Sequence, residues 1–257
     1  MKILFIGDIV ARPGRDTVKE VLPDILKKEE IDFCVANAEN IAHGRGATVG
    51  TIEELISVGV DFFTSGDHIF WQKGFEEEID NLPIIRPANL PPGQAGRGYE
   101  IVDTGKNGKI LLMNLQGRVF LNERVDDPFR KADEILEEVE GEDIAFSIVD
   151  FHAEATSEKY AFGFYLDGRV GAILGTHTHV PTCDQRVLPR KSLYISDIGM
   201  TGIIDSVLGV EKDIIIKYFL TGRNQRFEWE NTGTKAFRGV ILDTRKNSIE
   251  RVDQVIP

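Results

Sequence analysis

Cysteine is scarce in this chain, with only Cys34 and Cys183 among 257 residues. The two form no CxxC pair, and two cysteines cannot build the disulfide framework of a small secreted protein. Cys34 lies in an apolar run that predicts a buried strand, so we expect it to pack in the core. Cys183 follows a histidine cluster; it can be a soft metal ligand, although packing is the commoner role of cysteine.

Long apolar runs are absent as well. The apolar stretch at residues 3–6 is too short for the core of a signal peptide and predicts a first β-strand instead. No stretch approaches the length of a membrane span. We therefore expect a soluble cytoplasmic protein without a membrane partner.

Basic residues are too few to balance the acidic ones: 30 Lys and Arg against 42 Asp and Glu give a formal net charge of −12. Extended nucleic-acid binding is not expected, because it normally requires a basic stripe. A small phosphodiester or cyclic nucleotide remains open as the substrate, since bound metals can supply local positive charge. The hydrophobic fraction of 42% is enough for a sizeable core.

Strand and helix patterns alternate along the chain. We expect one domain over residues 1–257, with two packed sheets, helices outside and the site at the shared rim. The predicted strands are 2–7, 32–38, 61–64, 99–103, 109–115, 144–150 and 172–176, followed by three antiparallel strands within 226–256. The predicted helices are 14–30, which Pro23 can kink, 51–58 and 127–139.

Histidine is rare too, yet four of the five histidines fall in short polar clusters near the ends of predicted strands. Ligands bind at the carboxyl ends of strands in open α/β sheets. Carboxylates, amide oxygens and neutral imidazoles are suitable ligands for a pair of divalent metals. The clusters are Gly7-Asp8, Glu39-Asn40, Gly66-Asp67-His68, Asp150-Phe151-His152 and Gly175-Thr176-His177-Thr178-His179.

Several of these residues have simple metal-ligand roles. His177 and His179 are two positions apart, so an extended loop can steer both toward one site; the alternative is a pair of surface histidines. Glu39 can bridge two metals and Asn40 can offer its amide oxygen. Solvated loop positions are the alternative for this pair. Asp8 is equally compatible with a metal ligand and with a helix N-cap or Asx turn.

The neighbours Asp67 and His68 are expected to divide the work. Asp67 would bind metal, and His68 would protonate the leaving oxygen as a general acid. The alternative for His68 is to orient a ligand.

His152 is the expected ligand in the next cluster, where Asp150 can fix a histidine tautomer. Glu154 can cap the helix that begins near residue 156. The fifth histidine, His43, can touch phosphate at the rim or lie in solvent.

In their order along the chain, these clusters resemble those of the calcineurin-like metallophosphoesterases, and more narrowly those of the YmdB branch. The motifs of the resemblance run from residue 7 to about residue 202. They are Gly7-Asp8-Ile9-Val10-x-x-Pro13-Gly14-Arg15-Asp16, Asn37-Ala38-Glu39-Asn40-x-Ala42-His43-Gly44, Arg86-Pro87-Ala88-Asn89, Asn114-Leu115-Gln116-Gly117-Arg118, Asp150-Phe151-His152-Ala153-Glu154-Ala155-Thr156-Ser157-Glu158-Lys159 and Gly199-Met200-Thr201-Gly202.

The resemblance implies an α/β fold, namely a four-layer α/β/β/α metallophosphoesterase sandwich, with two metal ions per chain, iron or manganese. It implies hydrolysis of 2′,3′-cyclic nucleotides or related small phosphodiesters by a hydroxide that bridges the metals, and it leaves a homo-oligomer open. By position, His68 matches the catalytic histidine. One metal would be held by Asp8, Glu39, Asn40 and His179, and the other by Glu39, Asp67, His152 and His177, with Glu39 bridging.

Two positions depart from the pattern of the resemblance. The superfamily usually opens with Asp-x-His, whereas here Val10 takes the third place, and Asn40 would supply the missing ligand. Asp67 stands where both the superfamily and the branch ordinarily have Asn. The added negative charge is predicted to weaken the Lewis acidity of the metals or to favour a more highly charged metal state.

Two other functions fit the residues. One is a metal-dependent nuclease or phosphatase acting on RNA ends, for which the pair Phe70-Trp71 beside His68 offers a base platform. A core aromatic pair is the commoner interpretation of these two residues. The other is a regulatory protein in which phosphodiesterase activity is incidental.

Overall fold

Apolar runs form the central strands of two sheets. The computed structural model of the protein describes residues 1–122 and 124–257, and within them it contains two six-stranded sheets and five α-helices. The first sheet has the order β10-β11-β1-β2-β3, with β12 paired to β11, and the second has the order β4-β5-β6-β7-β9-β8.

The longer elements alternate between strand and helix, which is typical of α/β proteins. The helices are α1 (Ala11–Lys28), α2 (Val49–Ile56), α3 (Pro128–Glu138), α4 (Thr156–Leu166) and α5 (Lys212–Thr221). The strands are β1 (Lys2–Ile6), β2 (Phe33–Asn37), β3 (Phe62–Thr64), β4 (Tyr99–Asp103), β5 (Lys109–Gln116), β6 (Ile144–His152), β7 (Ala172–Thr176), β8 (Arg186–Val187), β9 (Leu193–Ile195), β10 (Gly202–Ile203), β11 (Lys235–Asp243) and β12 (Ser248–Ile256).

Side chains from both sheets meet in one apolar cluster. Phe5 and Val35 from the first sheet contribute to it, as do Leu112, Ile148 and Leu174 from the second. All five side chains are buried. Strands that are buried on both faces have near-continuous apolar sequences, and β1, β2 and β7 follow this rule.

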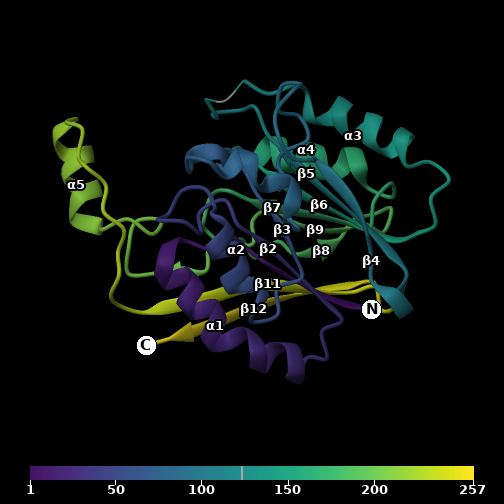
Figure 1. Cartoon of the computed structure of the whole chain (residues 1–257), viewed down its shortest axis with the longest axis horizontal. Coiled ribbons are helices and arrows are strands. Elements are labelled where there is room, and N and C mark those ends of the chain that lie inside the picture. The colour runs from purple at the N-terminus through teal and green to yellow at the C-terminus, as the bar shows by residue number, and fades with distance from the viewer. Residues whose placement is uncertain (123) are drawn as a thin grey trace.

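Helices cover the outer faces of the two sheets. Leu22 of α1 and Leu55 of α2 belong to a cluster with residues of the first sheet. Phe162 of α4 stacks on Phe151 of β6 with ring centroids 4.0 Å apart, in a cluster that also contains Ile135 of α3. Figure 1 shows α1 and α2 on one side of the strands, α3 and α4 on the other, and α5 projecting away from them.

The predicted order of elements is confirmed for residues 2–176, with small shifts of the boundaries. The hairpin is confirmed, because β4 pairs antiparallel with β5. The first helix begins at Ala11, earlier than predicted, since Pro13 is compatible with a first helical turn. Cys34 is buried as predicted. None of the described helices has the length and hydropathy needed to span a membrane.

The prediction of three antiparallel strands in 226–256 is wrong. The described residues of this stretch form two, β11 and β12. Before them, Trp229 makes only an isolated bridge to Val210, and the neighbouring Glu228, Glu230 and Gly233 interrupt any strand pattern. Sequence patterns also did not indicate α5 or the short strands β8, β9 and β10.

Gly175, in β7, is predicted to tolerate no side chain. A Cβ there would lie 1.7 Å from the backbone oxygen of Ser196, at the end of the neighbouring strand β9. Gly175→Ala should therefore lower the free energy of unfolding by about 1–3 kcal/mol, measured by urea denaturation. The control is Gly50→Ala on the open surface of α2, which should be neutral or stabilising by up to about 1 kcal/mol. Equal midpoints for parent and Gly175→Ala would contradict the packing argument.

Candidate metal centre

The first sheet delivers polar side chains at the carboxyl ends of three adjacent parallel strands. β1 pairs with β2 and β2 with β3, all in parallel, so their ends meet at one edge. Asp8 follows β1, Glu39 and Asn40 follow β2, and Asp67 and His68 follow β3. The polar strand ends predicted from the sequence thus lie together.

The second sheet brings three histidines to the same place. His152 is the last residue of β6, and β7, which pairs with it in parallel, leads into His177 and His179. The edges of the two sheets meet directly, since His152 Nε2 lies 2.9 Å from Glu39 Oε2 and 3.1 Å from Asp67 Oδ1.

The carboxylates and imidazoles gather into two groups that can each hold a metal ion. The ligating atoms of each group all lie within 4.8 Å of one another. Glu39 is common to both groups. The first group is Asp8, Glu39 and His179, and the second is Glu39, Asp67, His152 and His177.

In each of the three histidines, one ring nitrogen faces the metal-binding groups and the other contacts an acceptor oxygen outside them. His177 Nε2 lies 3.3 Å from Glu154 Oε2, and His179 Nδ1 lies 3.2 Å from the backbone oxygen of Leu208. Metal-bound histidines almost always donate their second N–H in this way. The arrangement therefore suits three imidazole ligands.

The outer nitrogen of His152 is oriented by a relay. The Thr176 hydroxyl donates to Asp150 Oδ1 over 2.6 Å, so it accepts from His152 Nδ1 over 2.9 Å. In the neutral ring this leaves the Nε2 lone pair facing the centre, where a bound metal ion would use it. Burial raises the pKa of Asp150 to about 6, although His152 and the hydrogen bond from Thr176 favour its charged form. Asp150 thus acts on the histidine tautomer through Thr176 and not by direct contact.

The carboxylates of the centre need positive charge nearby. Asp8 and Glu39 are buried, and Asp8 Oδ1 has no hydrogen-bond partner among the described residues. Burial raises the pKa of Asp8, and His179 offsets this only in part. Burial alone would also raise the pKa of Glu39, but His152 and His68 lower it well below its usual range. Buried carboxylates are stable only when paired or bound to metal, so this donor set fits divalent cations.

The loop that carries two of the histidines is strained and firmly held. His177 and His179 have φ values of 95° and 63°, which side chains rarely adopt outside sites that require them. Buried Lys159 donates to the Thr176 carbonyl over 2.8 Å and to Asp197 Oδ2 over 2.6 Å. The same Asp197 oxygen accepts from the Thr178 amide. This ion pair was not predicted from the sequence. The available signal was the position of Lys159, three residues before Phe162, which is buried in the structure.

Comparison with known proteins now identifies the family. The sequence model of the YmdB-like protein family matches residues 4–255. The chain belongs to the YmdB-like family. It is 47% identical over 245 residues to the 2′,3′-cyclic-nucleotide 2′-phosphodiesterase of Bacillus subtilis (strain 168), a match that covers 95% of this chain and 91% of that protein.

Solved structures agree with this assignment. A hypothetical protein from Thermus thermophilus matches with a TM-score of 0.93 and 39% identity, over 100% of both chains. A crystal structure described as a novel phosphatase from Mycoplasma pneumoniae matches with a TM-score of 0.90 and 34% identity, over 99% of this chain and 93% of that one.

Two polar residues of this YmdB-like chain sit beside the metal-binding groups. Asn40 Nδ2 lies 2.7 Å from Glu39 Oε1 and 3.2 Å from His179 Nε2, while its Oδ1 faces His68 Nδ1 at 3.3 Å. A half-turn of the amide would aim the oxygen at the first group. Burial opposes the charged form of His68, but Glu39 and Asp67 raise its pKa above the usual value. The His68 side chain is 23% exposed.

Other candidates lie outside the two groups. His43 is exposed and lines a separate cavity. Cys183 is exposed and belongs to neither group. The suggested cap by Glu154 is wrong, because α4 begins without a side-chain cap and Glu154 contacts His177 instead.

Gln116 of the YmdB-like chain is a polar residue for which sequence analysis gave no role. It lies opposite His152 in the β5–β6 pairing and is fully buried. The Asn89 side chain binds both its backbone N–H and its carbonyl, at 2.9 and 2.8 Å. Neither atom of the Gln116 amide has a partner in the described part of the chain. Two motifs of the family resemblance, one with Asn89 and one with Gln116, thus meet at one backbone position next to the centre.

Thr176→Val is predicted to weaken metal binding by about 10- to 100-fold, because His152 would lose the acceptor that fixes its tautomer. The measurement is competition for Mn²⁺ with a chromophoric chelator. Thr17→Val provides the control, since Thr17 is a buried threonine that bonds only within α1. An unchanged manganese affinity in Thr176→Val, or an equal loss in Thr17→Val, would argue against the relay.

Proposed function

We propose that this YmdB-like protein is a metal-dependent phosphodiesterase that hydrolyses 2′,3′-cyclic nucleotides or related small phosphodiesters. The observation that carries the proposal is the pair of metal-binding groups that share Glu39 and lie beside the partly exposed His68. The Bacillus subtilis relative, named as a 2′,3′-cyclic-nucleotide 2′-phosphodiesterase, supports the substrate class.

The proposed centre holds two metal ions, iron or manganese, on nitrogen and oxygen ligands. Two such ions would supply hydroxide at neutral pH and balance charge on the phosphoryl oxygens. Glu39 would bridge them. Asp8, Asn40 and His179 would complete one set of ligands, and Asp67, His152 and His177 the other.

His68 would move the proton that the leaving ribose oxygen needs. Its Nδ1 lies 3.5 Å from Glu39 Oε1 and its Nε2 lies 3.4 Å from Asp67 Oδ2, so both ring nitrogens face the centre. A general acid must reach the leaving atom, and in unliganded geometry such contacts are often long. Because His68 belongs to neither metal-binding group, its imidazole would be available for proton transfer.

The proposal extends to the architecture. The three apolar clusters, one between the sheets and one beneath each pair of helices, support a four-layer α/β/β/α sandwich that forms a single domain over residues 1–257. In such a layout the centre lies at the rim where both sheets end. We place this domain in the cytoplasm.

The direct test combines metal analysis with a substrate panel. Protein purified without added metal and then loaded with Fe²⁺ or Mn²⁺ should bind about two ions per chain. The loaded protein should hydrolyse 2′,3′-cyclic nucleotides faster than an RNA end or a phosphoprotein. Failure to bind two ions, together with no hydrolysis of any phosphodiester, would overturn the proposed function.

His68→Ala should lower kcat by about 100-fold or more, because the leaving oxygen would depart without a proton donor. Metal content should stay at the parental level, since His68 belongs to neither metal-binding group. The control is His43→Ala, in the other histidine that lies outside both groups. Loss of metal from His68→Ala would make this histidine structural. A regulatory effect of the protein that survives in this variant would favour a regulatory protein with incidental phosphodiesterase activity.

Asp67→Asn should strengthen the Lewis acidity of the centre, because the variant removes one negative charge next to the metals. The acidic limb of the pH–rate profile should move to lower pH at matched metal loading. In the iron form, the reduction potential should rise, since the lower oxidation state would be better tolerated. The same rate, pH profile and potential in both proteins would show that the charge of residue 67 has no effect.

A further inference from the structure

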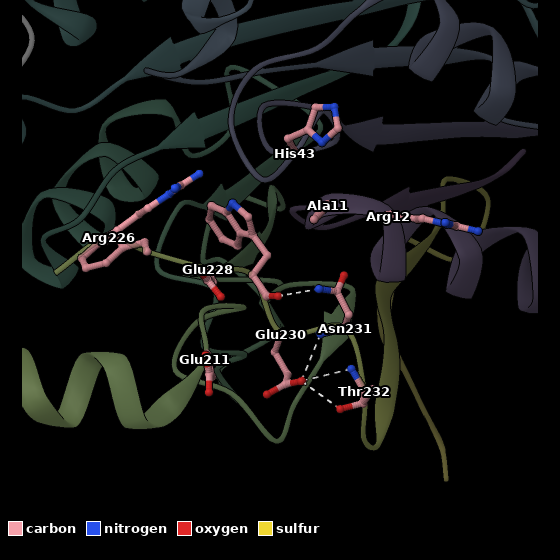
Figure 2. Close-up of a pocket in the computed structure, with 11 residues that line it drawn as sticks. Ala11, Arg12, His43, Glu211, Arg226, Glu228, Glu230, Asn231 and Thr232 are labelled. Carbon is pink, nitrogen blue, oxygen red and sulfur yellow. Dashed lines mark hydrogen bonds between the residues drawn. The ribbon is translucent and has the colours of Figure 1, made fainter.

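Two adjoining cavities share the side chains of Phe227 and Trp229. The smaller has a volume of about 380 Å³ and is also lined by Arg45 and Gln225. The larger, about 650 Å³, is also lined by Arg12, His43 and Arg226 (Figure 2). No residue of the metal-binding groups lines either cavity.

One side chain, that of Trp71, lies between His68 and Arg45, which lines the smaller cavity. The Trp71 ring meets the His68 ring edge-on with centroids 5.1 Å apart, and Trp71 is 54% exposed. The Arg45 guanidinium lies 4.6 Å from the centre of the Trp71 ring and also lines the cavity. Phe70 packs partly buried against the core, so the two neighbouring aromatic residues have different roles. The prediction that Phe70 and Trp71 form a core aromatic pair is therefore wrong for Trp71.

Trp229 is fixed to the same segments that carry the metal-binding residues. Its indole ring lies directly against Gly44, where a Cβ would come within 2.0 Å of it. It also packs on Val10, two positions after Asp8, and meets Gly209, next to the residue whose carbonyl accepts from His179. Trp229 is therefore anchored by the segments after β1 and β2 that also carry Asp8 and Asn40.

The chemistry of the smaller cavity suits a flat heteroaromatic ring. Trp229 and Phe227 offer aromatic faces, Arg45 a guanidinium plane, and Gln225 an amide that can bond the edge of a ring. Single-stranded bases are commonly bound by such stacking. Phe227 is 41% exposed and belongs to none of the apolar clusters of the described residues, so packing does not account for it.

Charge in the larger cavity favours a small ligand. Glu211, Glu228 and Glu230 line it on the side away from His43 (Figure 2). Arg12 and Arg226 also line it, but Arg12 already pairs with Asp16 at 3.4 Å. The carboxylates would repel the next phosphate of an oligonucleotide.

We propose that the cavity of Arg45, Gln225, Phe227 and Trp229 is a nucleobase subsite, which receives the base of a mononucleotide whose phosphodiester lies at the metal centre. This inference rests on the proposed phosphodiesterase function and adds the part of the site that selects nucleotides. Trp229 and Phe227 stack on the base, and Arg45 forms the wall toward Trp71, which in turn contacts His68.

The first test compares two substrates of Phe227→Ala: adenosine 2′,3′-cyclic phosphate and 1-O-methylribose 2′,3′-cyclic phosphate, which has no base. For the nucleotide, kcat/KM should fall about tenfold, mainly through KM, because one stacking face is lost. For the sugar phosphate it should change less than twofold. Phe219→Ala provides the control, since Phe219 is 77% exposed on α5 and lines neither cavity.

The second test needs neither metal nor turnover. In Trp71→Phe, Trp229 is the only tryptophan of the chain. Adenosine should quench its fluorescence saturably in metal-free protein, and adding Phe227→Ala should weaken that binding about tenfold.

The outcomes separate the subsite from the catalytic proposal. Equal effects of Phe227→Ala on both substrates, no effect on either, or no saturable quenching by adenosine would overturn the nucleobase subsite. A parent protein that hydrolyses neither substrate but binds adenosine through Phe227 would overturn the phosphodiesterase and leave the subsite standing.

Discussion

Buried negative charge is the constraint on which the rest of this structure depends. Asp8, Glu39 and Asp67 bring three carboxylates to one small space between two sheets, and the first two are fully withdrawn from water. Such a cluster is stable only with compensating cations and hydrogen-bond donors. The groups that can compensate this charge gather at one point. The parallel strand ends, the orientation of the imidazoles and the strained loop of His177 and His179 bring them there.

Asp150 shows how the two sheets are held in register around this charge. It lies on the second sheet, yet it accepts hydrogen bonds from Asn37 and Thr64 on the first and from Thr176 on its own. One buried carboxylate therefore joins both sheet edges and, through Thr176, sets the tautomer of His152. Because every partner is buried and polar, losing any one of them would leave a buried polar group unpaired next to the metal-binding side chains.

The polar strand ends could be predicted from the sequence because each is a local pattern, an apolar run followed by Asp8, Glu39 or Asp67. The second sheet's histidines were visible for the same reason. The buried pair Lys159–Asp197 could not be predicted, since the two residues lie far apart in the chain. The position of the Gln116 amide could not be predicted either, since it has no partner in the described part of the chain. The third strand expected before β11 was wrong, because the segment with Trp229 is fixed by contacts with Gly44 and Gly209 and not by a sheet.

A division between the proposed metal centre and the proposed nucleobase subsite would explain how an acidic chain selects a nucleotide. A centre of two metals would bind any phosphodiester of suitable size, so it would discriminate poorly between a cyclic nucleotide and other esters. Stacking on Trp229 and Phe227 would add affinity only when a base is present, and the carboxylates around the larger cavity would disfavour a second phosphate. Attraction at the phosphorus and selection at the base would then be carried by different residues.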